Sequence, residues 1–540
     1  MASPPPLFTA TRAQTLTYLL GVCPFSIAFL VFINSSISFV VTDLVGVHEG
    51  QGDVVGTLGF ADELLALAAC PLWGVLSDRI GVRYVCTVGY AIVALSLVLF
   101  VQAVNVYPQL LLGRLLFSLG ASAVSTMVTA VLPAVTDRPM PVRQDSNLDT
   151  DPASDEPAPS EPDARQRAPA SRLAGFVGMC AGCGALVALV VFLPLPARLQ
   201  QSGMSPPQSI QCSYYLVAAV AVVVSIGSLV GLKDLPGEGH KGWRSLWSTA
   251  DDPAHTGEGK PHLPYLGELS SAVALGFRNR DIFIGYLGGF VARASSVGIS
   301  LFIPLAVNHY YQTSGLCHDD SAGSPGDIKR SCPRAYVLAS ILTGVSQLVA
   351  LAVAPAMGYL SEKSRRYHLP LLTACFAGAV GFAAFALLPS PEYKGQNGTA
   401  AVFFIMGLMG ISQIGAIVCS LAVLSNGILQ VTGPTEPEHA NPTGSDPSDP
   451  PDEQRPLLAR PAPPQSRRLS HLKGSIAGVY SLYGGAGILL LTKVGGLLFD
   501  VLSSGAPFYI LAGFNGVLFL AGVTSGLLGS SKWLRGSHIA

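Results

Sequence analysis

Twelve long apolar runs constrain this chain more than any other feature of its sequence. Each approaches or exceeds the about 20 residues that an α-helix needs to cross a bilayer. In hydrocarbon only an internally hydrogen-bonded backbone is stable, so each run predicts a membrane-spanning helix and the chain an all-α integral membrane protein. The runs cover approximately residues 16–41, 54–77, 84–104, 108–134, 172–195, 212–232, 281–308, 335–357, 369–388, 400–427, 474–496 and 506–529.

The composition agrees with a membrane location and excludes several functions. Half of the residues are apolar and 12% are charged, whereas a soluble chain carries about 25% charged residues. The net charge is −1, so no overall field favours a nucleic acid as partner. The sequence contains no GxxxxGK[ST] phosphate loop and no HExxH or GxSxG motif. We therefore expect a protein of the lipid bilayer that is neither an enzyme nor an ATP-driven pump, with no cofactor and no metal.

The distribution of Lys and Arg predicts the orientation. With the N-terminus in the cytoplasm, the cytoplasmic segments hold 24 of the 32 basic residues, as the positive-inside rule requires. Twelve spans then return the C-terminus to the cytoplasm. The opposite side receives the sequon at Asn397, which is either glycosylated or fortuitous. It also receives Cys317 and Cys332, which we expect to form a disulfide in an oxidising compartment.

Hydrophilic segments divide the chain into two halves of six spans. Residues 1–232 form the first bundle and 276–540 the second, with 233–275 as a central cytoplasmic linker. Residues 136–171 and 431–472 are rich in Pro, Ser and acidic residues and follow the fourth and tenth spans. They bury too little apolar surface to offset chain entropy, so we predict disordered cytoplasmic loops.

The loop after the tenth span carries two short signals. Residues 453–458 resemble an acidic dileucine sorting signal through Glu453, Leu457 and Leu458, which predicts a sorting adaptor as partner. That reading favours a vacuolar or lysosome-like membrane, with the plasma membrane as the alternative. Ser470 follows two arginines as in a basophilic kinase site, where a phosphate would add about two negative charges. A basic stretch that serves orientation alone explains the arginines equally well.

A short charged motif occurs twice, each time after the second span of a half. It reads GVLSDRIGVRY at Gly74–Tyr84 and GYLSEKSRRY at Gly358–Tyr367. A Gly, a Ser-acid pair and clustered Arg in a tight turn resemble the loop signature of the major facilitator superfamily (MFS). The resemblance assigns gating roles to Gly74, Asp78, Arg79, Gly81 and Arg83 and, in the second copy, to Gly358, Glu362, Arg365 and Arg366.

Two further motifs extend this resemblance into the spans. Arg114–Gly120 is similar to the RxxxGxG pattern of the superfamily, with Ser118 at the first Gly. Gly178–Gly184 is close to the GxxxGPxxG signature of twelve-span, fungal-type proton-linked antiporters, with Cys183 in place of the Pro. The resemblance implies two pseudo-symmetric six-helix bundles that rock about a central cavity and bind a solute near the midplane.

Charged residues inside the spans predict the coupling site. A charge at the centre of a span costs about 2.5–3.5 kcal/mol even on the lenient insertion scale. Asp62 and Glu63 lie near the middle of the second span, and Arg114 lies in the fourth. Burial disfavours a charged carboxyl group, so either acid is a candidate proton carrier, with Arg114 in the relay or binding an anionic group. The alternative is an ion pair with Arg114 that only joins two helices.

The remaining polar residues of the spans are candidates for solute binding, although each can equally bond to a neighbouring helix. We predict a secondary active transporter of a small organic solute, coupled to protons. A uniporter and a non-transporting receptor or scaffold are the alternatives. The mixed charges favour a zwitterionic or anionic solute. A sugar and a hydrophobic drug are the alternative solute classes. The binding candidates are Asn34, Arg293, Gln347, Gln413, Tyr480 and Tyr483.

Overall fold

The protein is an all-α bundle, as the apolar runs predicted. The computed structural model describes residues 10–46, 51–136, 163–235, 265–314, 333–364, 369–393, 398–432 and 472–536. Within these ranges, twelve helices are long and apolar enough to cross a membrane, and each lies within a few residues of a predicted run. The expectations of a twelve-span, all-α fold are confirmed.

In the first half, the spans are continuous helices that include short π-helical turns. Gly81 separates the second span from the third. Its φ of +96° is a backbone conformation that favours glycine. The elements are α1 (Arg12–Leu16), η1 (Thr17–Val22), α2 (Cys23–Phe39), η2 (Val40–Leu44), α3 (Gln51–Ile80), α4 (Val82–Phe100), η3 (Val106–Leu110), α5 (Leu111–Thr136), α6 (Asp163–Val187), η4 (Ala188–Phe192), α7 (Leu195–Gln201) and α8 (Pro206–Gly231).

The second half repeats this plan after an additional short helix. Asn279 caps α10 by accepting hydrogen bonds from the backbone N–H groups of Asp281 and Ile282. The elements are α9 (Tyr265–Arg278), α10 (Arg280–Val297), η6 (Gly298–Phe302), α11 (Ile303–Thr313), α13 (Pro333–Lys363), α14 (Leu369–Ala386), α15 (Ala401–Thr432), α16 (Lys473–Leu490), η8 (Leu491–Gly495), α17 (Gly496–Val501) and α18 (Ala506–Gly536).

Two segment boundaries differ from the sequence prediction. Helix α6 begins at Asp163, inside the segment 136–171 that we expected to be disordered throughout. Ala, Arg and Gln at its start are strong helix formers, and they extend the span outward. The linker 233–275 likewise contains most of α9, a helix that the sequence analysis did not predict. Residues 137–162 and 433–471 lie outside the described residues, so the disorder expected for them stays a prediction.

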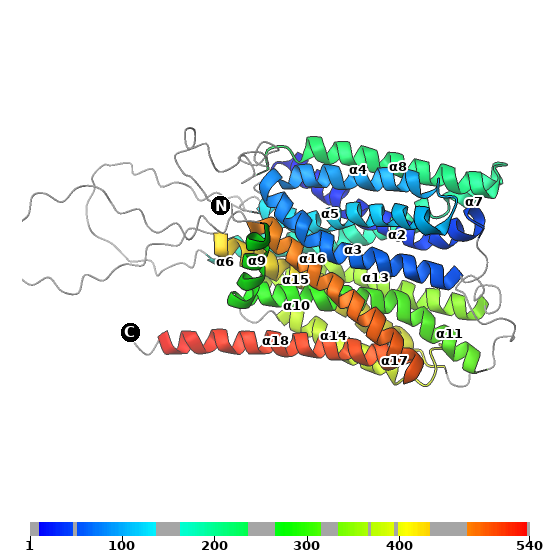
Figure 1. Ribbon diagram of the computed structural model, residues 1–540. Helices are drawn as coiled ribbons and strands as arrows, with labels where there is room; N and C mark the ends of the chain where they lie inside the picture. Colours follow the sequence, from blue (N-terminus) through cyan, green and yellow to red (C-terminus); the bar gives the residue numbers. More distant parts are fainter. Residues whose placement is uncertain are drawn as a thin grey trace, which may run out of the picture.

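The two halves meet along two matching pairs of helices. Helix α3, the second span, packs against α16, the eleventh, and α13, the eighth span, packs against α6, the fifth. The two interfaces thus pair equivalent spans of the two halves. Helices α8 and α18 lie at opposite edges of the bundle (Figure 1). Chain direction puts the start of α1 and the end of α18 at one end, which we call the terminal end (Figure 1).

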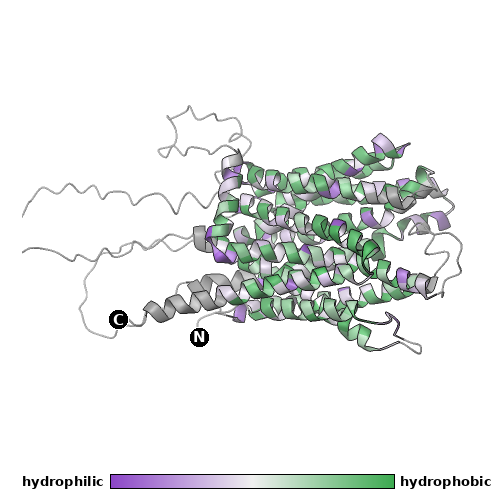
Figure 2. Cartoon of the chain, turned by 60° about the horizontal axis from the view of Figure 1, so that its bottom comes forward, coloured by the Kyte–Doolittle hydropathy of each residue, from purple (hydrophilic) through white to green (hydrophobic). Residues whose placement is uncertain are grey.

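The outer surface of the bundle is apolar, as lipid contact requires. Figure 2 shows hydrophobic residues along the middle of the helices and hydrophilic residues towards their ends. Val223 on α8, Phe376 on α14 and Leu520 on α18 are all exposed. Large exposed apolar surface of this extent would be unfavourable in water, so it indicates the lipid-facing side.

Glycines allow the halves to touch backbone to backbone near the terminal end. A Cβ atom on Gly74 would lie 2.4 Å from the carbonyl oxygen of Gly474 and 2.8 Å from the Cα of Gly478. At the matching interface, a Cβ atom on Gly175 would lie 2.9 Å from the Cα of Gly358. Neither position has room for a side chain while the halves are closed at this end.

Candidate functional site

A buried ion pair joins three helices in the first half. Asp62 of α3 accepts a hydrogen bond from Arg114 of α5, with 2.5 Å between Oδ2 and Nη2. The same Nη2 donates to Oδ1 of Asn34 on α2 at 2.5 Å. The hydroxyl group of Ser118, the Ser within the Arg114–Gly120 motif, donates to the main-chain carbonyl oxygen of Asp62 at 2.8 Å. The structure therefore shows the Asp62–Arg114 pair that the sequence analysis named as an alternative, and it adds Asn34, a solute-binding candidate, to that pair.

Arg114 is not saturated by these contacts. Its Nε and Nη1 atoms are buried and have no hydrogen-bond partner among the described residues. A buried guanidinium with open donors is costly. It is therefore suited to bind a further acceptor when one arrives.

Glu63 and Arg293 form a second set of charges, one in each half. Glu63 of α3 and Arg293 of α10 are both half-buried. Among the described residues, neither side chain has a hydrogen bond or an ion pair, but their charges act on each other electrostatically. The aliphatic part of Arg293 packs on α16, because a Cβ atom on Gly484 would lie 2.7 Å from its Cγ.

Amide and hydroxyl groups continue the polar surface of the second half. Gln347 of α13 donates to Oε1 of Gln413 on α15 at 3.2 Å. Gln413 in turn donates to the hydroxyl oxygen of Ser296 at 3.1 Å. Ser296 follows Arg293 by three residues, which places the two about one turn apart on α10. Two of the predicted binding residues therefore form one network beside Arg293.

The two predicted tyrosines are held by other side chains of the second half. The hydroxyl oxygen of Tyr480 lies 3.2 Å from that of Ser420. The ring of Tyr483 stacks on that of Tyr286, with 5.3 Å between their centres. These contacts fit a packing role as well as a binding role for both residues.

One further charge lies inside a span. The ammonium group of Lys493 lies 4.0 Å from the centre of the Phe60 ring, a cation–π contact between the eleventh and second spans. Lys493 is exposed. Its charge is therefore occupied by an aromatic ring.

The first loop motif latches the two halves together. One carboxylate oxygen of Asp78 accepts a hydrogen bond from the N–H of Gly474 at 2.7 Å. The other oxygen accepts bonds from the N–H and the hydroxyl group of Ser475, at 2.6 and 2.7 Å. Gly474 and Ser475 belong to the first turn of α16, whose free N–H groups favour an anion. Asp78 thus caps the start of a helix in the other half.

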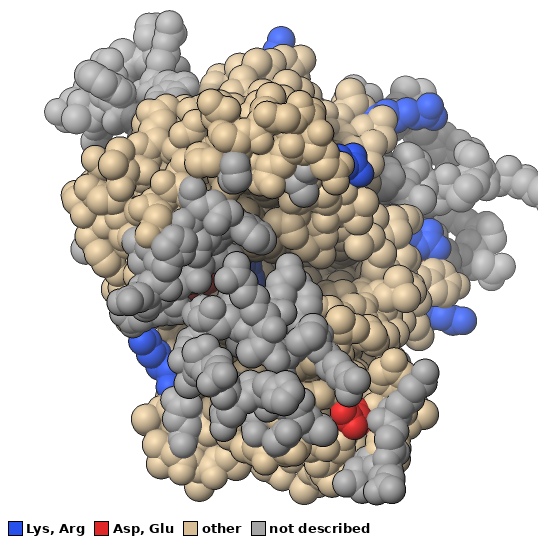
Figure 3. Space-filling model, turned by 90° about the vertical axis from the view of Figure 1, so that its right-hand side faces the viewer, with Lys and Arg blue, Asp and Glu red and all other residues tan. Residues whose placement is uncertain are grey.

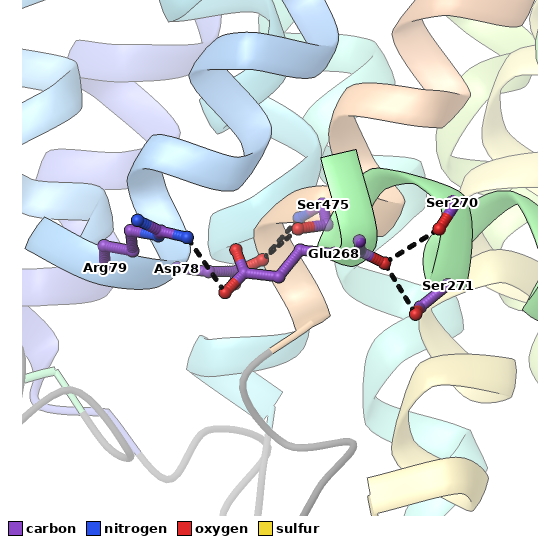
Figure 4. A network of polar contacts seen from close by, with 7 residues as sticks. Asp78, Arg79, Glu268, Ser270, Ser271 and Ser475 are labelled. Carbon is purple, nitrogen blue, oxygen red and sulfur yellow. Dashed lines mark hydrogen bonds and ion pairs between the residues drawn. The ribbon is translucent and has the colours of Figure 1, made fainter. Parts of the chain in front are cut away.

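The same motif also reaches α9 and α8. Arg79 forms an ion pair with Glu268 of α9 at 3.4 Å (Figure 4). The side chain of Glu268 is 4% exposed, so α9 covers this contact from the aqueous side. Arg83 donates to the main-chain carbonyl oxygen of Leu229 on α8 at 2.6 Å. Asp78 and Arg79 therefore link the motif to the second half, and Arg83 links it to a neighbouring helix of its own half.

The second loop motif makes a weaker version of the first latch. Glu362, at the end of α13, forms an ion pair with Arg172 of α6. The Arg172 side chain is 37% exposed, and pairs in contact with water contribute about 0–1 kcal/mol. Arg365 and Arg366, the other charged residues of this motif, lie outside the described residues.

Several predicted sites cannot be located, because they lie outside the described residues. Among the described residues there is no group of His, Cys, Asp and Glu that could hold a metal ion. The undescribed sites are the sequon Asn397, the expected disulfide of Cys317 and Cys332, the sorting residues Glu453, Leu457 and Leu458, and Ser470.

Sequence reasoning missed three partners of the loop motifs, namely Glu268, Ser475 and Arg172. Glu268 belongs to the amphipathic stretch YLGELSSAVALGFR, whose apolar residues recur at helical spacing and could have revealed α9. No local signal marks Ser475 or Arg172, because their importance arises only from contact with the other half.

Comparison with known proteins identifies the fold. The sequence model of the Major Facilitator Superfamily matches residues 24–141. No curated protein matches the chain. The E. coli fucose:proton symporter FucP is 13% identical, with a TM-score of 0.53 over 95% of this chain and 98% of that one.

Two other solved structures share this architecture. The human organic anion transporter MFSD10 is 14% identical, with a TM-score of 0.51 over 96% of this chain and 100% of that one. The proton:xylose symporter XylE is 12% identical, with a TM-score of 0.51 over 94% of each chain. At these identities the structures show a common fold and no common solute. The sequence match covers part of the first half, and the solved structures share the fold along the whole length, so the chain has the fold of Major Facilitator Superfamily transporters.

Proposed function

We propose that the protein is a secondary active transporter that moves a small organic solute by alternating access and couples this movement to protons. The observation that carries the proposal is the Asp62–Arg114 pair at the core of the first half, with Glu63 beside it. A scaffold has no need to bear the insertion cost of these charges. FucP and XylE are proton symporters of the same fold, and MFSD10 is an organic anion transporter.

The conformation supports an alternating-access cycle. Both loop motifs close the terminal end, through Asp78 in one interface and Glu362 in the other. At the opposite end, a few atoms of acidic and basic residues are visible below the surface near the middle (Figure 3). By the positive-inside argument the closed end faces the cytoplasm. The solute would then enter from the lumenal or extracellular side in this state.

Protonation of Asp62 is one coupling step that this geometry allows. A proton on Asp62 removes the charge that holds Arg114, and the guanidinium can then bind an anionic or hydrogen-bonding group of the solute. Loss of a proton restores the pair and releases that group. Glu63 is the alternative carrier, since it is half-buried and close to the same charges.

Proton movement in proteoliposomes tests this function. A pH dye inside the vesicles would follow amino acids, peptides, carboxylates, sugars and cationic drugs, with wild type, Asp62→Asn and Glu63→Gln. Asp234→Asn is the matched control, because Asp234 is exposed outside the spans and its φ of +55° suits Asn. We expect one solute class to move protons in wild type and control and not in one of the two carboxyl variants.

Other outcomes distinguish the alternatives. Radiolabelled solute uptake without any proton signal would indicate a uniporter and refute the coupling. No uptake of any class, from protein that is folded and correctly oriented, would favour a receptor or scaffold. The proposed vacuolar location is tested separately. The double variant Leu457→Ala, Leu458→Ala should shift the protein from internal membranes to the cell surface.

A further inference from the structure

Two half-buried charges that have no hydrogen bond or ion pair to a described residue indicate what kind of solute the site takes. We propose that Glu63 and Arg293 bind the two ends of a zwitterion, a small molecule with one ammonium and one carboxylate group such as an amino acid. The inference rests on the proposed transport function and adds the substrate class and two residue roles to it. Arg293 would hold the carboxylate and Glu63 the ammonium group.

The two acidic neighbours of α3 have different surroundings. The carboxylate of Asp62 is taken by Arg114. Glu63, the next residue, has no hydrogen bond or ion pair to a described residue and is only half-buried. The carboxylate of Glu63 is therefore the one that remains available to a ligand.

Arg293 presents a guanidinium group from the other half in the same way. Its stem is fixed by close contact with Gly484 of α16. Its head has no hydrogen bond or ion pair to any described residue, yet its charge acts on Glu63. A planar guanidinium with free donors matches the two oxygens of a carboxylate. Lys493 does not compete for this role, because its ammonium group lies on the Phe60 ring.

Charge balance selects a zwitterion over a singly charged solute. With the Asp62–Arg114 pair closed, Glu63 and Arg293 contribute one negative and one positive charge. A zwitterion adds one charge of each sign, so both side chains gain a partner when water leaves the site. While Glu63 is ionised, a monocarboxylate would leave it unpaired, and an amine would leave Arg293 unpaired; either is unfavourable in a medium of low dielectric constant.

The position of the two charges also links binding to closure. Glu63 belongs to α3 in the first half and Arg293 to α10 in the second. A ligand held at both ends therefore pulls the halves together. The amide network of Gln413 and Gln347 lies beside Arg293 through Ser296 and offers hydrogen bonds to the rest of the solute.

A binding experiment on the purified full-length protein tests the inference separately from coupling. The twenty standard amino acids would be screened by calorimetry and thermal shift. The tightest one would then be compared with its decarboxylated amine and its deaminated acid, which differ from it by one charge each. We expect each analogue to bind about 30-fold more weakly or worse, the cost of leaving one buried charge unpaired.

Reciprocal variants assign the two roles. In Arg293→Gln the amine should bind about as well as the amino acid, and in Glu63→Gln the acid should do so. Arg293→Lys and Glu63→Asp retain the charges and should restore part of the preference for the zwitterion. They also show that loss of binding does not come from misfolding.

Three results would overturn the inference. If a sugar or a monocarboxylate binds or is transported and no amino acid is, the site is not zwitterion-specific while the transport function stands. If an amino acid binds and Glu63→Gln leaves the discrimination unchanged, the assignment of the ammonium site is wrong. If no solute of any class binds or moves, both the inference and the proposed function fail.

Discussion

The contact at Gly74 makes the closed state of the terminal end sensitive to a single methyl group. In Gly74→Ala the new Cβ atom would lie 2.4 Å from the carbonyl oxygen of Gly474 and 2.8 Å from the Cα of Gly478. Both are backbone atoms, so no side-chain rotation relieves the overlap. Helices α3 and α16 must separate, and overpacking of this kind costs about 1–3 kcal/mol.

This cost applies only while the terminal end is closed. When the halves separate there, the methyl group meets solvent, so the penalty shifts the equilibrium towards the open state. At 1.4 kcal/mol for each factor of ten, we expect the open state to become about 5- to 150-fold more populated. Gly59→Ala is the matched control on the same helix, because its Cβ atom would have no neighbour within 4 Å.

Cys70 provides the assay for this shift. It lies one turn before Gly74 on α3, with its carbonyl oxygen at the contact with Gly478 and its thiol 4.0 Å from the carbonyl oxygen of Ser122, and is 6% exposed. In a variant with the other nine cysteines replaced, maleimide applied at the terminal end would label Cys70 at a rate set by the open population. Gly74→Ala should raise this rate by the factor above, and Gly59→Ala should not. An unchanged rate in folded Gly74→Ala protein would refute the reasoning.

Three further predictions concern the two loop motifs, the Asp62–Arg114 pair and the sequon. Asp78→Asn should speed the labelling of Cys70 at least tenfold, since Asp78 accepts three hydrogen bonds from the other half. Glu362→Gln should change the labelling rate less than about fivefold, because its ion pair is in contact with water. Equal effects of the two variants would contradict the difference between the two loop motifs. Arg114→Gln should reduce the free energy of unfolding by about 3–5 kcal/mol by leaving Asp62 unpaired, and the double variant with Asp62→Asn should recover part of this loss in denaturant titrations. Glycosidase should shift the wild-type band on a gel and leave Asn397→Gln unmoved, and no wild-type shift would mean that the sequon is unused.

The sequence was sufficient for the fold because membrane spans are encoded locally. Length and hydropathy alone define each span, and the repeated loop motif revealed the two halves. The same local signals located Asp62, Glu63 and Arg114, since charges are conspicuous in apolar runs. The pairing of Asp62 with Arg114 was among the stated alternatives, and the structure shows it.

Contacts between the halves could not be predicted in this way. Asp78 and Ser475 are nearly 400 residues apart in the chain, and they meet only in the conformation that is closed at the terminal end. Helix α9 was missed for another reason. Its apolar residues are too few for a span, and they become buried only because the ends of α3, α10 and α16 are already in place.

The two latches at the terminal end differ in strength, and this difference sets an order of events. The pair Glu362–Arg172 is in contact with water, so ionic strength and passing counterions weaken it. The carboxylate of Asp78 is buried on the first turn of α16 and is shielded from salt. The terminal end should therefore open first between α6 and α13, while α3 and α16 stay in contact until Asp78 releases Gly474 and Ser475.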